Sequence, residues 1–178
     1  MTERAVRPPG WPLVLVLFAV AGLLLLRDCH SLRQGSLAGP IGKAAPDAPV
    51  VAMDGAKSRL HSFHGRPLWL NFFATWCQPC KAEMPEIEQR YKRLGGASLA
   101  VVGVDQQETP ALVARFARPL ALSFPIVIDD GPAASAYDVF ALPTSVFIDE
   151  HGVVQAVHVG EMSPQQMDAD LARIISVR

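Results

Sequence analysis

Apolar residues follow regular patterns along most of the chain after residue 49. The runs at 67–73 and 99–104 are nearly continuous and apolar, which is typical of strands buried on both faces of a sheet. Between them, apolar residues recur at steps of four, three, four and three, which predicts a helix that ends before Gly95-Gly96. The residues of this stripe are Cys80, Met84, Ile87, Tyr91 and Leu94.

Shorter segments around turn residues predict two β-hairpins. Each pair of segments flanks a turn that contains aspartate and glycine, as hairpin turns often do. The pairs are 49–52 with 59–60, at the start of the patterned region, and 144–148 with 153–159, near its end.

A second helix is predicted from Thr109, a favoured N-cap residue, with Pro110 as its first residue. We expect Leu112 and Phe116 to lie on one side of this helix. The segment 124–128 after it predicts a third buried strand.

The last helix is predicted after Ser163, an N-cap residue that is followed by the capping-box glutamine Gln166. Its apolar face consists of Met167, Leu171 and Ile174. Strands alternate with helices before a hairpin ends the pattern. We therefore predict an α/β domain in which helices cover both faces of a mixed sheet.

The N-terminus has a different pattern. Residues 8–26 are 19 uncharged residues, and as a helix they would span about 28 Å, close to the apolar thickness of a bilayer. A cleaved signal peptide is the alternative, since the most apolar part is only slightly longer than the apolar region of such peptides. Arg27 and Asp28 stand where a cleavage site would need small residues, which favours an uncleaved membrane anchor over residues 1–29. Residues 30–45 are predicted to be a flexible linker and residues 46–178 the globular domain.

Composition narrows the class of protein further. Half of the 178 residues are hydrophobic and 19% are charged, which excludes a disordered or fibrous chain. A net charge of −1 argues against general binding to nucleic acid. Residues 1–38 carry four basic and two acidic residues and residues 39–178 carry 12 and 15, so an acidic domain follows a basic anchor. Three cysteines are too few for a disulfide-stapled scaffold or a four-sulfur zinc site.

Two of these cysteines, Cys77 and Cys80, lie three residues apart between a predicted strand and the start of a helix. The N-terminus of a helix carries partial positive charge and unpaired N–H groups, which favour a thiolate there. Cys77 is therefore the predicted nucleophile. Cys80 begins the apolar stripe, so we expect it to be more buried and to act as the resolving thiol.

The segment from Trp76 to Cys80 resembles the TlpA/ResA branch of the thioredoxin-like proteins. The resemblance extends to Asn71-Phe72-Phe73, Glu83-Met84-Pro85, 45–49, 141–144 and Gly160. It implies a thioredoxin fold over residues 46–176, with three α/β/α layers, a mixed central sheet and an N-terminal β-hairpin extension. It also implies a protein disulfide oxidoreductase that needs no cofactor.

The resemblance further assigns roles to residues far from the two cysteines in sequence. It implies that Pro143 is a cis-proline beside the two sulfurs and that Leu142 offers its backbone to an extended substrate segment. Trp76 and Gly160 are expected to bind substrate as well.

Glu83 is a candidate for moving protons. Thioredoxins have a buried aspartate where this chain has Asn71, so Glu83 is the nearest carboxylate to the thiols. It lies one helical turn after Cys80, and TlpA/ResA proteins have a glutamate there too. A carboxylate at this position could take and return a thiol proton during exchange. Alternatively, Glu83 is a solvated residue of the first turn that only favours the helix dipole.

The resemblance implies a reductase that is anchored in the bacterial inner membrane, with its catalytic domain facing the periplasm. Expected clients are disulfides of proteins such as apocytochrome c or the copper-site proteins of respiratory oxidases. A membrane thiol-transfer protein is the expected electron donor.

A copper-binding chaperone and a peroxidase are the alternative functions. A copper-binding chaperone would use Cys77 and Cys80 with a histidine as ligands, but copper-carrying relatives space their cysteines differently. A peroxidase of the peroxiredoxin type would need a Pro-x-x-x-Thr-x-x pattern before its cysteine, which is missing here. No metal site is expected at His61 and His64, which are predicted to be surface residues, and Cys29 is predicted to be an unpaired linker thiol, with lipidation or intermolecular pairing as alternatives.

Overall fold

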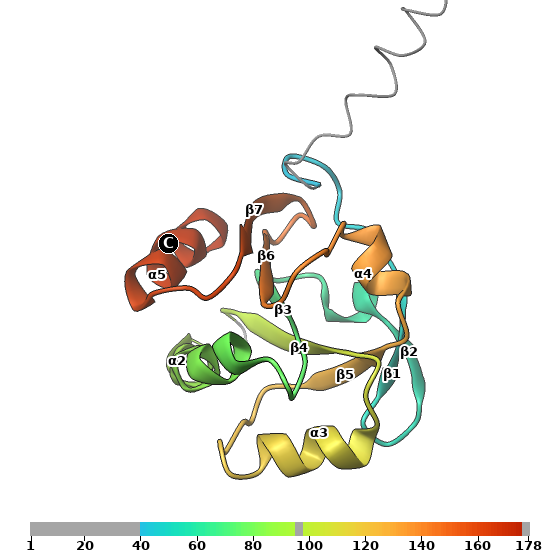
Figure 1. Ribbon diagram of the computed structural model, residues 1–178. Helices are drawn as coiled ribbons and strands as arrows, with labels where there is room; N and C mark the ends of the chain where they lie inside the picture. Colours follow the sequence, from blue (N-terminus) through green and yellow to red (C-terminus); the bar gives the residue numbers. More distant parts are fainter. Residues whose placement is uncertain (1–39, 95–97, 176–178) are drawn as a thin grey trace, which may run out of the picture. The chain divides into compact units, whose positions relative to one another are not determined.

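The computed structural model describes residues 40–94 and 98–175, which form one seven-stranded sheet with helices on both faces (Figure 1). The strands are β1 (Pro49–Ala52), β2 (Lys57–Arg59), β3 (Leu68–Phe73), β4 (Ala100–Gln106), β5 (Ile126–Asp129), β6 (Thr144–Ile148) and β7 (Val154–Val159). The helices are a 3-10 turn (Leu60–Phe63), α2 (Gln78–Leu94), α3 (Pro110–Ala117), α4 (Pro132–Ala136) and α5 (Pro164–Ile174).

The sheet has the strand order β2-β1-β5-β4-β3-β6-β7. The three central strands β3, β4 and β5 run parallel, and every other neighbouring pair is antiparallel. Parallel neighbours need crossover helices, which α2 and α3 supply, whereas the outer antiparallel pairs β1–β2 and β6–β7 are the two predicted hairpins. The predicted three-layer α/β/α architecture with its mixed sheet and N-terminal hairpin is confirmed.

The central strand β3 divides the core into two layers. All six of its residues are buried, and successive side chains point to opposite faces. Trp69 and Phe73 join the apolar cluster that includes buried residues of α2, α3 and α5. Leu68 and Phe72 join the cluster on the opposite face, toward α4. Asn71 therefore points to the same face as α2, which places an amide beneath the helix that carries the cysteines.

The helix α3 differs from its prediction in the side that it buries. Leu112 and Phe116 do share one side, but Leu112 is 39% exposed and both residues border an open groove. Val113 is the fully buried residue of this helix. The strand β5 also starts at Ile126, two residues later than predicted.

The short helix α4 was missed because five residues are too few for an apolar period to show. A buried carboxylate at its start explains it. The side chain of Asp129 accepts hydrogen bonds from the backbone N–H groups of Gly131, Ala133 and Ala134, so tertiary contacts rather than local pattern hold the turn.

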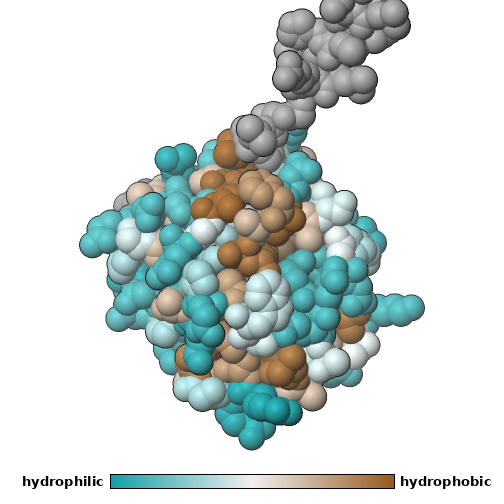
Figure 2. Space-filling view, in the orientation of Figure 1, coloured by the Kyte–Doolittle hydropathy of each residue, from teal (hydrophilic) through white to brown (hydrophobic). Residues whose placement is uncertain are grey.

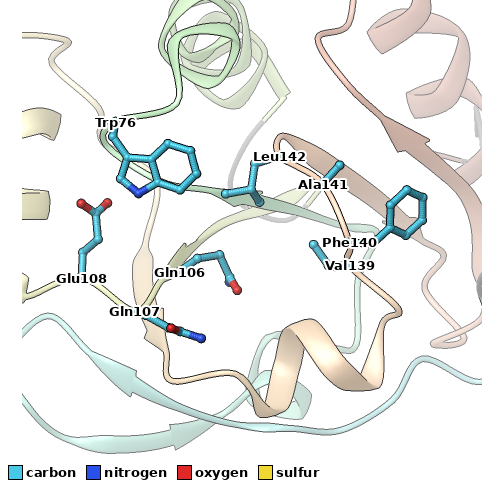
Figure 3. Close-up of a pocket in the computed structure, with 8 residues that line it drawn as sticks. All are labelled: Trp76, Gln106, Gln107, Glu108, Val139, Phe140, Ala141 and Leu142. Carbon is cyan, nitrogen blue, oxygen red and sulfur yellow. The ribbon is translucent and has the colours of Figure 1, made fainter.

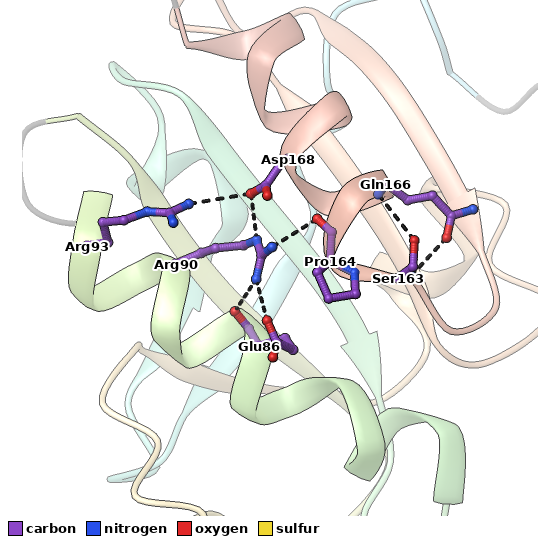
Figure 4. Close-up of polar contacts among 7 residues, drawn as sticks. All are labelled: Glu86, Arg90, Arg93, Ser163, Pro164, Gln166 and Asp168. Atoms are coloured by element: carbon purple, nitrogen blue, oxygen red, sulfur yellow. Dashed lines mark hydrogen bonds and ion pairs between the residues drawn. The ribbon is translucent and has the colours of Figure 1, made fainter.

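The last helix has the predicted capping box, in which Ser163 and Gln166 exchange side-chain and backbone hydrogen bonds (Figure 4). Its predicted apolar face is buried: Met167, Leu171 and Ile174. The buried guanidinium of Arg90 on α2 also donates to the carboxylate of Asp168 and to the carbonyl oxygen of Pro164 (Figure 4). These bonds fix the start of α5 against α2.

The predicted anchor, residues 1–29, lies outside the described residues, as does the predicted linker up to residue 39. Within residues 40–94 and 98–175, no helix has both the length and the apolarity needed to cross a bilayer.

Candidate active site

Cys77 and Cys80 form a disulfide at the start of α2, with their Cα atoms 5.3 Å apart. Cys77 immediately precedes the helix and is 5% exposed, whereas Cys80 lies in the first turn and is fully buried. The difference in exposure has the predicted direction, because Cys80 is the more buried residue. Beside it, the indole of Trp76 is 69% exposed.

The backbone around Cys77 supplies the electrostatics that a reactive thiol needs. The N–H of Cys80 points at the sulfur of Cys77, with a nitrogen–sulfur distance of 3.2 Å. The sulfur thus takes the place of an N-cap oxygen at the positive end of a helix with 17 residues. When the disulfide is reduced, this end of the helix stabilises the thiolate of Cys77.

Glu83 is buried in the apolar layer rather than solvated, with only 2% exposure. Its Oε1 accepts a hydrogen bond of 2.8 Å from the side-chain amide of Asn71, and its Oε2 accepts one of 3.1 Å from the backbone N–H of Met162. Removal from water raises the pKa of Glu83 to about 7, although both hydrogen bonds favour the ionised form. The alternative of a solvated first-turn glutamate is therefore wrong.

Asn71 is itself fully buried and incompletely paired. Its amide nitrogen also donates to the hydroxyl of Ser145, at 3.1 Å, across the β3–β6 register. Its carbonyl oxygen Oδ1 has no hydrogen-bond partner in the described part of the chain. A free acceptor thus lies on the side chain that contacts Glu83.

The loop before β6 and the loop after β7 meet at a single hydrogen bond. The Leu142–Pro143 peptide bond is cis, as expected. The N–H of Gly160 donates to the carbonyl oxygen of Pro143 at 2.8 Å. Gly160 has a φ of +97°, a left-handed conformation that favours glycine. Through Met162, the same segment reaches the carboxylate of Glu83.

A second buried carboxyl group, at the end of β4, was not found from the sequence. Asp105, at the end of β4, is fully buried, and its Oδ2 has no partner among the described residues. Burial, together with the neighbouring carboxylate of Glu108, raises the pKa of Asp105. Glu108 in turn accepts hydrogen bonds from the backbone N–H and the hydroxyl of Thr75, at 2.5 and 2.8 Å. Glu108, next to Asp105, thus fixes Thr75, which lies two residues before Cys77.

The sequence held a signal for this pair. Thr75 follows β3 and Asp105 ends β4, and the two strands are parallel neighbours. Groups at the carboxyl ends of adjacent parallel strands meet at one edge of the sheet, where α/β proteins place their sites.

A groove of about 500 Å³ lies next to the exposed indole of Trp76 (Figure 3). Three segments line it: Trp76 itself, residues 106–108 after β4, and residues 139–142 before β6. Figure 3 shows the side chains of Trp76, Leu142 and Phe140 along one side of this space, with Gln106 and Gln107 across from them. Phe140 is 75% exposed, so two large aromatic rings border the groove.

The groove brings together two of the three predicted substrate-binding residues, Trp76 and Leu142. The third, Gly160, is connected to it only through Pro143, which follows Leu142. Phe140, with its exposed ring, was not predicted. The substrate-binding roles of Trp76, Leu142 and Gly160 stay predictions.

The described part of the chain contains no group of three histidine, cysteine or acidic side chains that could hold a metal ion. The rings of His61 and His64 lie 4.8 Å apart, but no third ligand joins them there. His61 is exposed, as predicted, whereas His64 is half-buried, and this burial lowers its pKa. The copper-chaperone alternative therefore has no complete ligand set among these residues.

Comparison with known proteins agrees with this geometry. The sequence pattern of the AhpC/TSA family matches residues 41–157. The chain is 35% identical over 166 residues to the thiol-disulfide oxidoreductase ResA of Bacillus thuringiensis (strain Al Hakam), covering 89% of this chain and 96% of ResA.

Solved structures are similar as well. The thiol:disulfide interchange protein of Chlorobium tepidum TLS has a TM-score of 0.67 and 28% identity, covering 78% of this chain and 99% of its own. The pneumococcal exposed lipoprotein thioredoxin Etrx1 of Streptococcus pneumoniae strain TIGR4 has a TM-score of 0.60 and 26% identity, covering 71% and 98%.

Proposed function

The chain belongs to the AhpC/TSA family and is a thioredoxin-like thiol–disulfide oxidoreductase, and we propose that it reduces disulfides of client proteins outside the cytoplasm. The observation that carries the proposal is the Cys77–Cys80 disulfide at the start of α2, with Cys77 as the more exposed sulfur. This geometry suits a nucleophile that meets the client and a resolving thiol that stays inside.

The reaction begins with the reduced protein. The thiolate of Cys77 attacks one sulfur of the client disulfide, which forms a mixed disulfide and releases one client thiolate. The thiol of Cys80 then loses its proton and attacks the sulfur of Cys77. The second client thiolate leaves, and the Cys77–Cys80 disulfide forms. The client gains two electrons and the chain loses two. The chain also loses the proton of Cys80, and because Cys77 starts as a thiolate, the second proton that the client thiolates take up comes from water.

We assign Glu83 to the proton of Cys80. A carboxyl group with a pKa of about 7 is partly ionised at neutral pH, so it can accept the proton and later return it. The Glu83→Gln variant keeps the shape of the side chain but cannot accept a proton. We expect it to change the pH dependence of thiol reactivity, measured by alkylation of the reduced protein between pH 5 and 9. An unchanged profile would leave Glu83 without this role.

Client binding is assigned to the groove beside Trp76. Its exposed rings, Trp76 and Phe140, suit apolar client side chains, and the backbone at Leu142 suits an extended client segment. Apocytochrome c and the copper-site proteins of respiratory oxidases are the proposed clients. A membrane thiol-transfer protein is the proposed electron donor.

The location is proposed on two grounds. Residues 8–26 are long and apolar enough to anchor the chain in a bacterial inner membrane, and a structurally similar protein is called an exposed lipoprotein. An anchored chain would stay with membranes after alkaline carbonate washing and would run at its full mass. Release with a shortened N-terminus would contradict the anchor.

The direction of electron flow is tested by the reduction potential of the Cys77–Cys80 pair, measured by equilibration with glutathione. A client reductase should have a reduction potential below about −200 mV, as thioredoxin has, whereas strong oxidants have potentials of about −120 mV. A potential near the second value would contradict the reducing direction. In a parallel assay of insulin disulfide reduction, Cys77→Ser should abolish turnover.

A further inference from the structure

A second groove lies beside Thr75, two residues before Cys77. It has a volume of about 320 Å³ and lies between the start of α2 and the helix α3 with the turn that follows it. Its lining is mainly apolar, with two cationic residues: Thr75, Lys81, Leu112, Arg115, Phe116, Pro119 and Leu120. We call it the cationic groove.

Its apolar lining is partly open to solvent. Leu112 is 39% exposed although it belongs to an amphipathic helix, because Val113 rather than Leu112 faces the core. The ring of Phe116 stacks on Phe73 in β3, so this part of the lining packs against the sheet. Figure 2 shows hydrophobic residues among hydrophilic ones at the lower end of the molecule, where α3 lies in Figure 1.

The charge of this region is opposite to that of the domain. Residues 39–178 carry three more acidic than basic residues, yet the stretch 109–128 has two arginines and no acidic residue. Lys81 and Arg115 are both exposed, and neither forms an ion pair with any described residue. Two uncompensated cations thus stand at the rim of an apolar groove.

The cationic groove and the groove beside Trp76 are joined through one residue. Thr75 lines the cationic groove, and Glu108, which lines the other groove, binds both its N–H and its hydroxyl. The groove beside Trp76 has no lysine or arginine in its lining. The two surfaces next to Cys77 therefore differ in charge, so they suit segments of different chemistry.

We propose that the cationic groove docks a segment of a redox partner protein that combines apolar side chains with carboxylates. Apolar side chains would cover Leu112 and Phe116, and carboxylates would pair with Lys81 and Arg115. Such pairing guides encounter and sets the partner's orientation more than it adds affinity. The inference rests on the proposed function, since the docked partner is one that exchanges disulfides with Cys77.

The test uses the full-length, reduced protein in a nonionic detergent and three synthetic peptides. Each peptide carries one cysteine in a mixed disulfide with thionitrobenzoate, whose release is followed by absorbance. The peptides share the same leucine and phenylalanine positions and differ in having glutamates, glutamines or lysines between them. At low salt we expect the glutamate peptide to react about tenfold faster than the glutamine peptide. The lysine peptide should be slower still, and high salt should remove these differences.

Variants locate the effect. Arg115→Gln and Leu112→Ser should each reduce the advantage of the glutamate peptide to less than about threefold. The control is Lys43→Gln, since this exposed lysine adjoins β7 at the opposite edge of the sheet, and it should keep the full advantage. Equal rates for the three peptides, or an advantage that survives Arg115→Gln, would overturn the inference.

A small uncharged disulfide, 2-hydroxyethyl disulfide, separates this inference from the proposed function. It cannot use either groove, so wild type and both variants should reduce it at equal rates. A wild type that fails to reduce it contradicts the proposed function itself. Normal reduction of this probe without a preference for the glutamate peptide overturns the docking inference alone.

Discussion

Replacing Glu83 by glutamine should change how stability depends on pH, and the structure gives the size of the change. Burial raises the pKa of this carboxyl group from an ordinary value of 4.5 to about 7 in the folded protein. A tenfold difference in proton affinity corresponds to about 1.4 kcal/mol, so the difference amounts to about 3 kcal/mol of unfolding free energy.

The sign follows from where the proton binds more tightly. Because the folded state holds the proton of Glu83 more strongly than the unfolded state, the contribution of protonated Glu83 is fully present below about pH 4.5. It is lost as the pH rises through about 7. Glutamine does not titrate. The unfolding free energy of Glu83→Gln minus that of wild type should therefore increase by about 3 kcal/mol between pH 4.5 and pH 8.

Urea unfolding of the oxidised protein measures this difference without interference from the cysteines, which do not titrate as a disulfide. Asp105 also has a raised pKa, but it is present in both proteins and cancels in the difference. Glu150→Gln, at an exposed position of the β6–β7 hairpin, is the control for removing a surface carboxylate, and its difference should change by much less than about 3 kcal/mol. Parallel curves for Glu83→Gln and wild type would refute the buried, proton-holding carboxyl group.

Three further predictions concern the surroundings of the site. Asp105→Asn should melt at a higher temperature than wild type at pH 8 and at about the same temperature at pH 5, because the raised pKa of Asp105 makes its charged form costly; a constant difference would contradict this. Arg90→Met should lower the unfolding free energy by about 2–3 kcal/mol in urea, since the buried guanidinium binds α2 to the start of α5. Arg93→Met, at an exposed position, should lower the unfolding free energy by less than about 1 kcal/mol; equal losses for the two variants would exclude this role of Arg90. Asn71→Asp should destabilise by about 2–3 kcal/mol more at pH 8 than at pH 5, as two buried carboxylates would then face each other; equal losses at both pH values would count against this contact.

Local patterns were enough for most of the fold. The strands β3 and β4 are continuous apolar runs, and the α2 stripe and the Ser163 capping box are complete within one segment, so each could be predicted without knowing its neighbours. The helix α4 could not, because the carboxylate of Asp129 that caps it belongs to a strand whose end must first be placed. The burial of Val113 instead of Leu112 likewise depends on how α3 docks on the sheet.

The same division holds for the site. The spacing of Cys77 and Cys80 and the start of a helix are local, so a redox-active pair could be predicted from the sequence, and the structure forms its disulfide. That Glu83 is buried depends on two contacts from other segments, Asn71 in β3 and Met162 after β7. The hydrogen bonds between Glu108 and Thr75 join two residues that are 33 positions apart in sequence. The redox chemistry of Cys77 and Cys80 could be predicted because one segment supplies both residues. The raised pKa of Glu83 could not, because the packing of several segments sets it.

The identity of residue 71 bears on the proton role that we propose for Glu83. An aspartate there would compete with Glu83 for one proton, whereas an amide can meet both forms of the carboxyl group. The NH₂ group of Asn71 donates to Oε1 of Glu83 at 2.8 Å, a bond that favours the ionised form. Its Oδ1 has no partner among the described residues. The carboxyl group to which we assign the proton of Cys80 thus lies against a side chain that has both a donor and an acceptor.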